Sequence, residues 1–208
     1  MFRLVCSVLI TCTIAPAFQQ TESESEKDVY AIYSLMLTNP QTSHGPDHNP
    51  WYLIAPATVP GTPQVPCVTP PEERAPEFRE VLVDFEHRKA TQQQLKPAFS
   101  IPKPYFLLSA DEVKAFIEDR ASGKTQPGNT DERFRGVADL FTLTGVYFNP
   151  RRTLALTAIS SWCGSLCALY QWKVLEKTDT GLWQERNWGA CATIARNSSP
   201  SKVPIAAN

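Results

Sequence analysis

The sequence predicts an α+β protein in which about three N-terminal helices pack on a C-terminal four-stranded antiparallel meander. Two observations support this prediction. Apolar residues recur at spacings of three and four in several segments of residues 29–117, which is the period of a helix. Residues 141–188, in contrast, are rich in β-branched and aromatic residues and are divided by short turn signals. A chain in which helices come first and strands follow is typical of the α+β class.

Length and composition fit one domain with irregular connections. The chain has 208 residues, of which 42% are hydrophobic and 20% charged, and its formal net charge is -1. We expect no nucleic-acid partner, because neutralising a phosphate backbone requires a dense basic surface. The 18 prolines predict long irregular segments. We expect a single domain over residues 27–196 and a loose tail over residues 197–208.

Residues 1–17 have the three-part layout of a secretory signal peptide. Arg3 precedes an apolar run over residues 4–14, and Ala15-Pro16-Ala17 is a small-x-small cleavage site. The apolar run is too short to span a membrane, which requires about 20 residues. No later stretch is apolar for long enough, so we expect no membrane span.

The signal peptide predicts an exported protein, either periplasmic or extracellular. Residues 18–26 are polar and acidic, and we expect them to form a flexible leader of the mature chain. A lipoprotein anchored at Cys12 is the alternative, because residues 9–12 resemble a lipobox. That motif requires a smaller residue than Thr11 before the cysteine, which favours cleavage after Ala17 and a protein without a lipid anchor.

Three segments have the apolar periodicity of helices. The first starts at Lys27 and ends at Asn39-Pro40, because a residue before proline avoids helical backbone. The second covers residues 76–94. The third follows Ser109, which forms a capping box with Glu112. The apolar residues expected to face the core are Val29, Ile32, Tyr33, Met36 and Leu37 in the first helix, Phe78, Val81, Leu82 and Phe85 in the second, and Val113, Phe116 and Ile117 in the third.

Short strands are expected between these helices. Residues 51–59 favour an edge strand, since Pro56 interrupts them and proline cannot donate to a central ladder. Residues 60–71 contain five prolines and predict an extended surface segment around Cys67. Residues 105–108 favour a short buried strand.

The C-terminal sheet is predicted from four strands with short connections. Asn149 to Arg152 and Thr178 to Gly181 are turns, and we expect Arg151 and Arg152 to be solvated. Short connections between successive strands imply antiparallel pairing. The strands are expected over residues 141–148, 153–162, 169–177 and 182–188.

Four cysteines remain once the signal peptide is removed. In an oxidising compartment an even number predicts two disulfides, for which three connectivities are possible. The short spacing favours Cys163 with Cys167, which leaves Cys67 to pair with Cys191. The alternatives for Cys163 and Cys167 are a redox pair, a metal site and free thiols. A redox motif has two residues between its cysteines, whereas three lie here, which favours a structural bond.

The other candidate site residues are few. His44 and His48 could ligate zinc together with Asp47, but the surrounding Gly and Pro predict a loop, in which that spacing loses its geometry. His87 is predicted on the second helix without a recognisable nucleophile. Trp172 could offer a binding surface, although four tryptophans in the last fifty residues favour a core role. We expect no nucleotide cofactor, since phosphate-binding glycine motifs are absent, and no metal, since the His44–His48 spacing falls in a loop.

The C-terminal third resembles a family of uncharacterised exported bacterial proteins. The resemblance rests on residues 141–149 (FTLTGVYFN), on Cys163-Gly164-Ser165-Leu166-Cys167, and on the LEK and GLW segments within residues 175–183. In that family a VGFN strand start precedes an AL strand, a CGxLC loop, a strand ending in Lys, and GxW. Residues 168–170 (ALY) depart from the glycines that usually follow the loop. The resemblance implies bacterial export and a four-stranded C-terminal sheet, and it implies no catalytic residue.

These observations lead to three functional hypotheses. The first is a non-catalytic exported module that binds a ligand or acts structurally and is stabilised by disulfides. The second is an extracytoplasmic hydrolase of unrecognised type, with His87 or the loop from His44 to His48 near its site. The third is a thiol–disulfide protein that uses Cys163 and Cys167. The sequence identifies no ligand and no protein partner.

Overall fold

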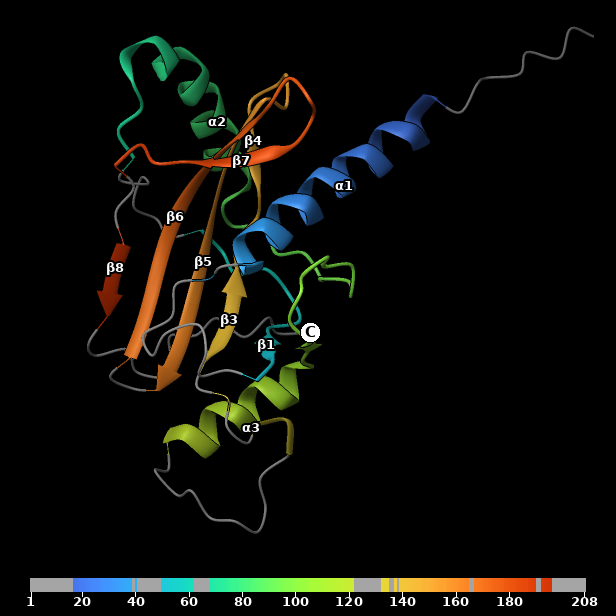
Figure 1. Ribbon diagram of the computed structural model, residues 1–208, viewed down its shortest axis with the longest axis vertical. Coiled ribbons are helices and arrows are strands. Elements are labelled where there is room, and N and C mark those ends of the chain that lie inside the picture. The colour runs from blue at the N-terminus through green and yellow to red at the C-terminus, as the bar shows by residue number, and fades with distance from the viewer. Residues whose placement is uncertain are drawn as a thin grey trace, which may run out of the picture.

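The fold is α+β, with helices on both faces of one mixed sheet (Figure 1). The computed structural model describes residues 17–38, 40, 50–61, 68–121, 132–134, 137, 139–164, 167–189 and 192–195. The expected signal peptide before Ala17 and the expected tail over residues 197–208 lie outside them.

The described residues contain three α-helices and eight strands. The helices are α1 (Ala17–Thr38), α2 (Ala75–Arg88) and α3 (Ala110–Ala121), and single 3₁₀ turns cover Glu72–Arg74 and Glu132–Phe134. The strands are β1 (Tyr52–Ile54), β2 (Tyr105–Leu107), β3 (Leu140–Leu143), β4 (Tyr147–Phe148), β5 (Leu154–Gly164), β6 (Cys167–Lys177), β7 (Trp183–Arg186) and β8 (Ala192–Ala195). Their order is β2-β1-β3-β5-β6-β7, with β4 paired to β5 and β8 paired to β6.

The predicted four-stranded antiparallel meander is wrong, because the early strands join the same sheet in parallel. β1 lies between β2 and β3 and is parallel to both. Parallel neighbours need long crossover connections, and the segments that contain α2 and α3 supply them. Therefore β1 is a central strand rather than an edge strand. The edge is β2, where Phe106 is 37% exposed instead of buried.

The antiparallel half of the sheet is built on the long hairpin of β5 and β6. The single strand expected over residues 141–148 is instead two strands, β3 and β4, which both pair with β5. Leu143 pairs with Ile159 and Tyr147 pairs with Leu156. Between these two pairs the chain of β3 and β4 advances by four residues, whereas β5 advances by three. That extra residue is a bulge, and it breaks the ladder between β3 and β4.

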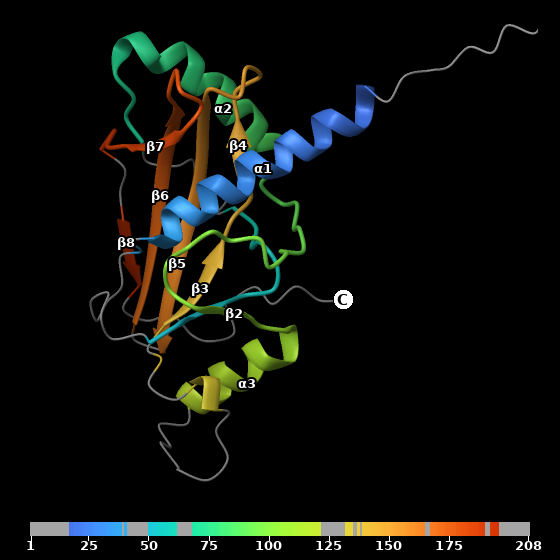
Figure 2. The ribbon, with the colours of Figure 1, turned by 45° about the vertical axis from the view of Figure 1, so that its right-hand side comes forward.

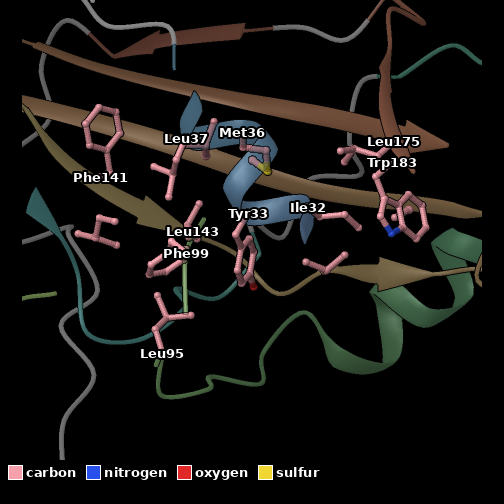
Figure 3. Close-up of a cluster of buried hydrophobic side chains, with 14 of the residues drawn as sticks. Ile32, Tyr33, Met36, Leu37, Leu95, Phe99, Phe141, Leu143, Leu175 and Trp183 are labelled. Carbon is pink, nitrogen blue, oxygen red and sulfur yellow. The ribbon is translucent and has the colours of Figure 1, made fainter. Parts of the chain in front are cut away.

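Side-chain alternation along β5 divides the core between the two faces of the sheet. Ala155 and Ile159 pack with the buried side chains of α1, a cluster that Figure 3 shows. Leu156 and Ala158 pack with α2 on the opposite face, where Trp162 also contacts the core beside α3. Because successive residues of a strand point to opposite faces, β5 contributes side chains to the core beside each of the three helices.

Helix α1 starts earlier than its apolar periodicity predicts. It begins at Ala17 rather than Lys27, so residues 18–26 are helical, and this N-terminal part extends beyond the sheet in both views (Figures 1 and 2). The predicted core face is confirmed for Ile32, Tyr33, Met36 and Leu37, which are all buried. The Tyr33 hydroxyl donates a hydrogen bond of 2.8 Å to the Thr144 carbonyl, which attaches the helix to the bulge.

Candidate functional site

The candidate site is a cavity of about 650 Å³. Its walls come from α1, from α2 with the segment that follows it, and from the turn between β4 and β5. This volume lies in the range of small-molecule sites. Half of the lining residues are charged or aromatic, and the following contacts hold them in place.

Helix α2 contributes Arg88 and Asp84, one helical turn apart. The guanidinium of Arg88 donates from Nε to Asp84 Oδ1 (2.6 Å) and from Nη2 to Asp84 Oδ2, and Nη2 also donates to the Val146 carbonyl (2.7 Å). The Phe148 N–H donates to Asp84 Oδ2 (2.8 Å). Burial raises the pKa of Asp84, but the bonds from Arg88 and Phe148 outweigh it and leave the pKa below its usual value. Arg88 is therefore fixed against β4 at one edge of the cavity.

The turn between β4 and β5 contributes Arg152. Its guanidinium lies 3.8 Å from the centre of the Phe148 ring, and it donates from Nε to Asp28 Oδ2 (3.3 Å) and from Nη2 to the Ser25 carbonyl (3.1 Å). Arg152 is the only non-glycine residue with positive φ (52°) in the described part of the chain. Asn149 closes the turn by accepting the Leu154 N–H (3.0 Å) through its side chain.

Asp28 ties α1 to this turn and to the sheet. Besides Arg152, it accepts hydrogen bonds from Lys177 Nζ (2.8 Å) and Trp183 Nε1 (3.0 Å). Burial raises the pKa of Asp28, and the bonds from Lys177, Trp183 and Arg152 lower it further than burial raises it. The Asp28 carboxylate of α1 is thus the common acceptor of donors from β6, β7 and the β4–β5 turn.

A second contact joins α1 to the segment after α2. Glu26 pairs with Lys96 at 2.5 Å, and the Lys96 N–H donates to the Tyr30 hydroxyl (2.6 Å). Both charged side chains of this pair are about half exposed or more, at 46% and 65%. Exposed ion pairs contribute roughly 0–1 kcal/mol, so the Glu26–Lys96 pair adds little to the attachment of α1 at this point.

None of the predicted site residues that the structure describes lines this cavity. His87 is exposed near the end of α2, and Trp172 is buried between Phe85 and Tyr170. His44, His48, Cys67 and Cys191 lie outside the described residues. Within the described part of the chain, no three His, Cys, Asp or Glu side chains are grouped closely enough to hold a metal ion.

Sequence reasoning missed both cavity arginines. Arg152 was expected to be a solvated turn residue, whereas it is paired with Asp28 and packed on Phe148. Its only local signal is the turn itself, because Asp28 is 124 positions away in the sequence. The Arg88–Asp84 pair could have been predicted, because Asp84 stands four residues before Arg88 on a predicted helix and such residues face one another.

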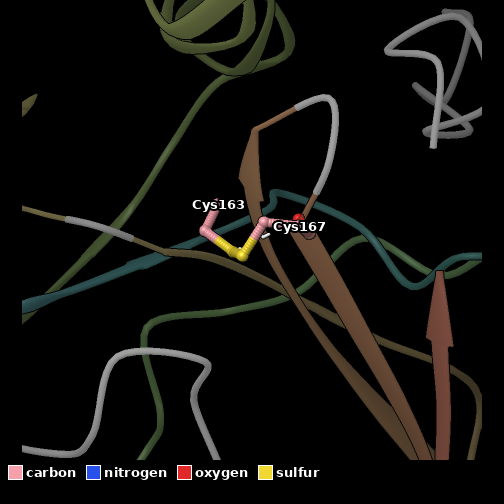
Figure 4. The surroundings of a disulfide bond; sticks show 2 residues. All are labelled: Cys163 and Cys167. Atoms are coloured by element: carbon pink, nitrogen blue, oxygen red, sulfur yellow. Dashed lines mark hydrogen bonds between the residues drawn. A yellow bond between two sulfur atoms is a disulfide. The ribbon is translucent and has the colours of Figure 1, made fainter. Parts of the chain in front are cut away.

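Cys163 and Cys167 are joined by a disulfide at the end of the β5–β6 hairpin (Figure 4). Their Cα atoms are 5.1 Å apart, within the usual range of the bond. Gly164 follows Cys163 with φ of 130°, a conformation that side-chain-bearing residues rarely adopt. The bond links two paired strands and lies apart from the cavity-lining residues.

Replacing both cysteines by serine should lower the free energy of unfolding by about 1–2 kcal/mol. The closed loop is short, and the β5–β6 ladder already brings its ends together, so the entropic gain is modest. Urea unfolding of the C163S/C167S variant measures the change, with oxidised wild-type protein as the reference, because a reductant would also open the expected Cys67–Cys191 bond. An unchanged unfolding midpoint in the variant would show that the Cys163–Cys167 bond is dispensable.

No helix in the described residues combines the length and apolar character that crossing a bilayer requires. The comparisons with known proteins give no relative: no family model, no curated protein and no solved structure matches this chain.

Proposed function

We propose that this protein is a non-catalytic binding module whose ligand is a small polar molecule held in the cavity between α1, α2 and the β4–β5 turn. The observation that carries the proposal is the cavity itself, about 650 Å³ in volume with polar groups fixed on several sides. Binding sites of this kind combine concave shape with a few oriented polar groups.

The state of the cavity carboxylates supports binding rather than catalysis. A general base works best when its pKa lies near the working pH. Hydrogen bonds from Arg88 and Phe148 keep the pKa of Asp84 below its usual value, which makes it a poor proton acceptor near neutral pH. Glu26 is engaged with Lys96. These groups are arranged to hold one another and to present donors, and they are not arranged to move a proton.

Chemical-shift mapping tests this proposal. The ¹H–¹⁵N spectrum of the protein should be recorded with a collection of small polar compounds sorted into neutral, cationic and anionic sets. We expect binding compounds to shift amides of residues 25–33 and 146–152 together, because both segments line the cavity. Saturable shifts confined to other segments, or none with any compound, would contradict the proposal.

The proposed module acts outside the cytoplasm. Residues 1–17 support export by their signal-peptide layout, and the Cys163–Cys167 bond supports it because disulfides persist in oxidising compartments. Intact mass of the exported protein tests this part. A mass starting at Phe18, with four thiols that appear only on reduction, is the expected result. Lipid on Cys12, or an unprocessed chain, would contradict it.

A further inference from the structure

Two guanidinium groups reach the same cavity from different parts of the chain. Arg88 comes from α2 and Arg152 from the β4–β5 turn. Phe148 connects them, since its N–H binds the Asp84 carboxylate that holds Arg88, while its ring lies under the Arg152 guanidinium. Each arginine is therefore fixed in orientation before any ligand arrives.

Each of these arginines keeps one end for another acceptor. Arg88 and Arg152 both use Nε and Nη2 for the contacts described above. Their Nη1 atoms make no hydrogen bond with a described residue and are not among the buried atoms that lack a partner, so they reach solvent. A guanidinium held by one edge presents its remaining N–H groups in a fixed geometry, which suits a carboxylate or phosphate.

The charges around the cavity favour an anion over a cation. Its walls carry three cationic side chains, Arg88, Lys96 and Arg152, against two carboxylates, Glu26 and Asp84. The Asp28 carboxylate behind Arg152 is shared with Lys177, so it does not fully neutralise Arg152. An incoming anion would compete with Glu26 for Lys96. Because the Glu26–Lys96 pair is exposed and therefore weak, Glu26 is easily displaced.

We infer that the ligand of this cavity carries an anionic group, a carboxylate or a phosphate, and that Arg88 and Arg152 bind that group through their Nη1 atoms. The inference rests on the proposed binding function and specifies the chemistry of its ligand.

Titrations with two simple anions test the inference. Sodium phosphate and sodium acetate are added to wild-type protein at ionic strength held constant with sodium chloride, and the arginine Nε–H resonances are followed by NMR. We expect saturable shifts of the Arg88 and Arg152 resonances, and the anion that saturates at lower concentration indicates whether the natural group is a phosphate or a carboxylate. Shifts no larger than those with chloride alone would overturn the inference.

Variants assign the effect to the cavity. R152Q should weaken binding of the better anion by about tenfold or more, because a hydrogen bond to a charged group is lost. R151Q is the matched control: Arg151 stands on the same turn, pairs with Glu77 on the surface and does not line the cavity, so binding should stay within about twofold. R152K separates charge from geometry and serves if R152Q does not fold. Equal losses in R151Q and the Arg152 variants would overturn the inference.

The two proposals can fail separately. If neutral or cationic compounds shift residues 25–33 and 146–152 while phosphate and acetate do not, the binding module stands and the anion inference is wrong. If compounds of every class leave these segments unchanged, both are wrong.

Discussion

Asp28→Ala should lower the free energy of unfolding by about 2–3 kcal/mol. The Asp28 carboxylate is 14% exposed and accepts hydrogen bonds from Lys177, Trp183 and Arg152. Its removal takes this acceptor from Lys177, from the Trp183 indole and from Nε of Arg152, which keeps only its bond to the Ser25 carbonyl. The cost is that of partly buried charges losing a partner. Guanidinium chloride unfolding measures the change, and in thermal unfolding the midpoint should fall by roughly 4–12 °C.

Glu26→Ala is the matched control for this variant. Glu26 stands two residues before Asp28 on the same helix and also pairs with a lysine, but that pair is exposed. We expect a change within about 0.5 kcal/mol. If the two variants lost equal stability, the Asp28 cluster would not be what attaches α1 to the sheet.

The same carboxylates should make stability fall in acid. The pKa values of Asp28 and Asp84 are lowered in the fold for the reasons given above, and that of Glu112 is lowered by the Ser109 N–H and by Arg133. A group whose pKa is lower in the folded state stabilises fully above its unfolded pKa, which is about 4. That stability is lost as the pH drops through the folded value.

Urea unfolding between pH 7 and pH 2 measures this dependence. The free energy of unfolding should be nearly constant down to about pH 5 and then decrease as the pH falls below about 4. Asp28→Asn should flatten part of that decrease, since the substituted side chain cannot titrate. An acid branch that is unchanged in this variant would contradict the role assigned to Asp28.

Local signals were enough to predict the elements whose structure is decided nearby. The capping box at α3 is confirmed by bonds from the Ser109 N–H to Glu112 Oε2 (2.6 Å) and from the Glu112 N–H to Ser109 Oγ (3.3 Å). The turn after β6 is confirmed by the bond from the Gly181 N–H to the Thr178 carbonyl (2.8 Å). Both motifs lie within four residues, so the sequence alone specifies their geometry.

The parallel half of the sheet could not be predicted in the same way. β1 and β2 have three residues each, too few to show a period. Their position depends on the segments with α2 and α3, which return the chain to the end of the sheet where the previous strand began. That return is a property of the whole fold. The cavity has the same origin, because its arginines are oriented by carboxylates on α1 and α2 and by a ring on β4.

Phe85→Ala should lower the free energy of unfolding by about 3–5 kcal/mol, more than Asp28→Ala. Phe85 is fully buried on α2, with its ring centre 5.0 Å from that of Tyr147 and 5.5 Å from that of Trp172. The backbone at Gly61 packs so closely that an added Cβ would lie 2.8 Å from the Phe85 ring. The neighbouring core is therefore closely packed on several sides, and truncation leaves a cavity.

Val83→Ala on the same helix provides the control and shows why Phe85 matters to the site. Val83 is 58% exposed, so its truncation should cost less than about 0.5 kcal/mol. Phe85 adjoins Asp84 in sequence, and its contact with Tyr147 holds α2 against the strand that carries Phe148. Phe85→Ala should therefore also broaden or shift the Arg88 Nε–H resonance, whereas Val83→Ala should leave it in place. Equal losses of stability in the two variants would mean that α2 packs on the sheet through a different face.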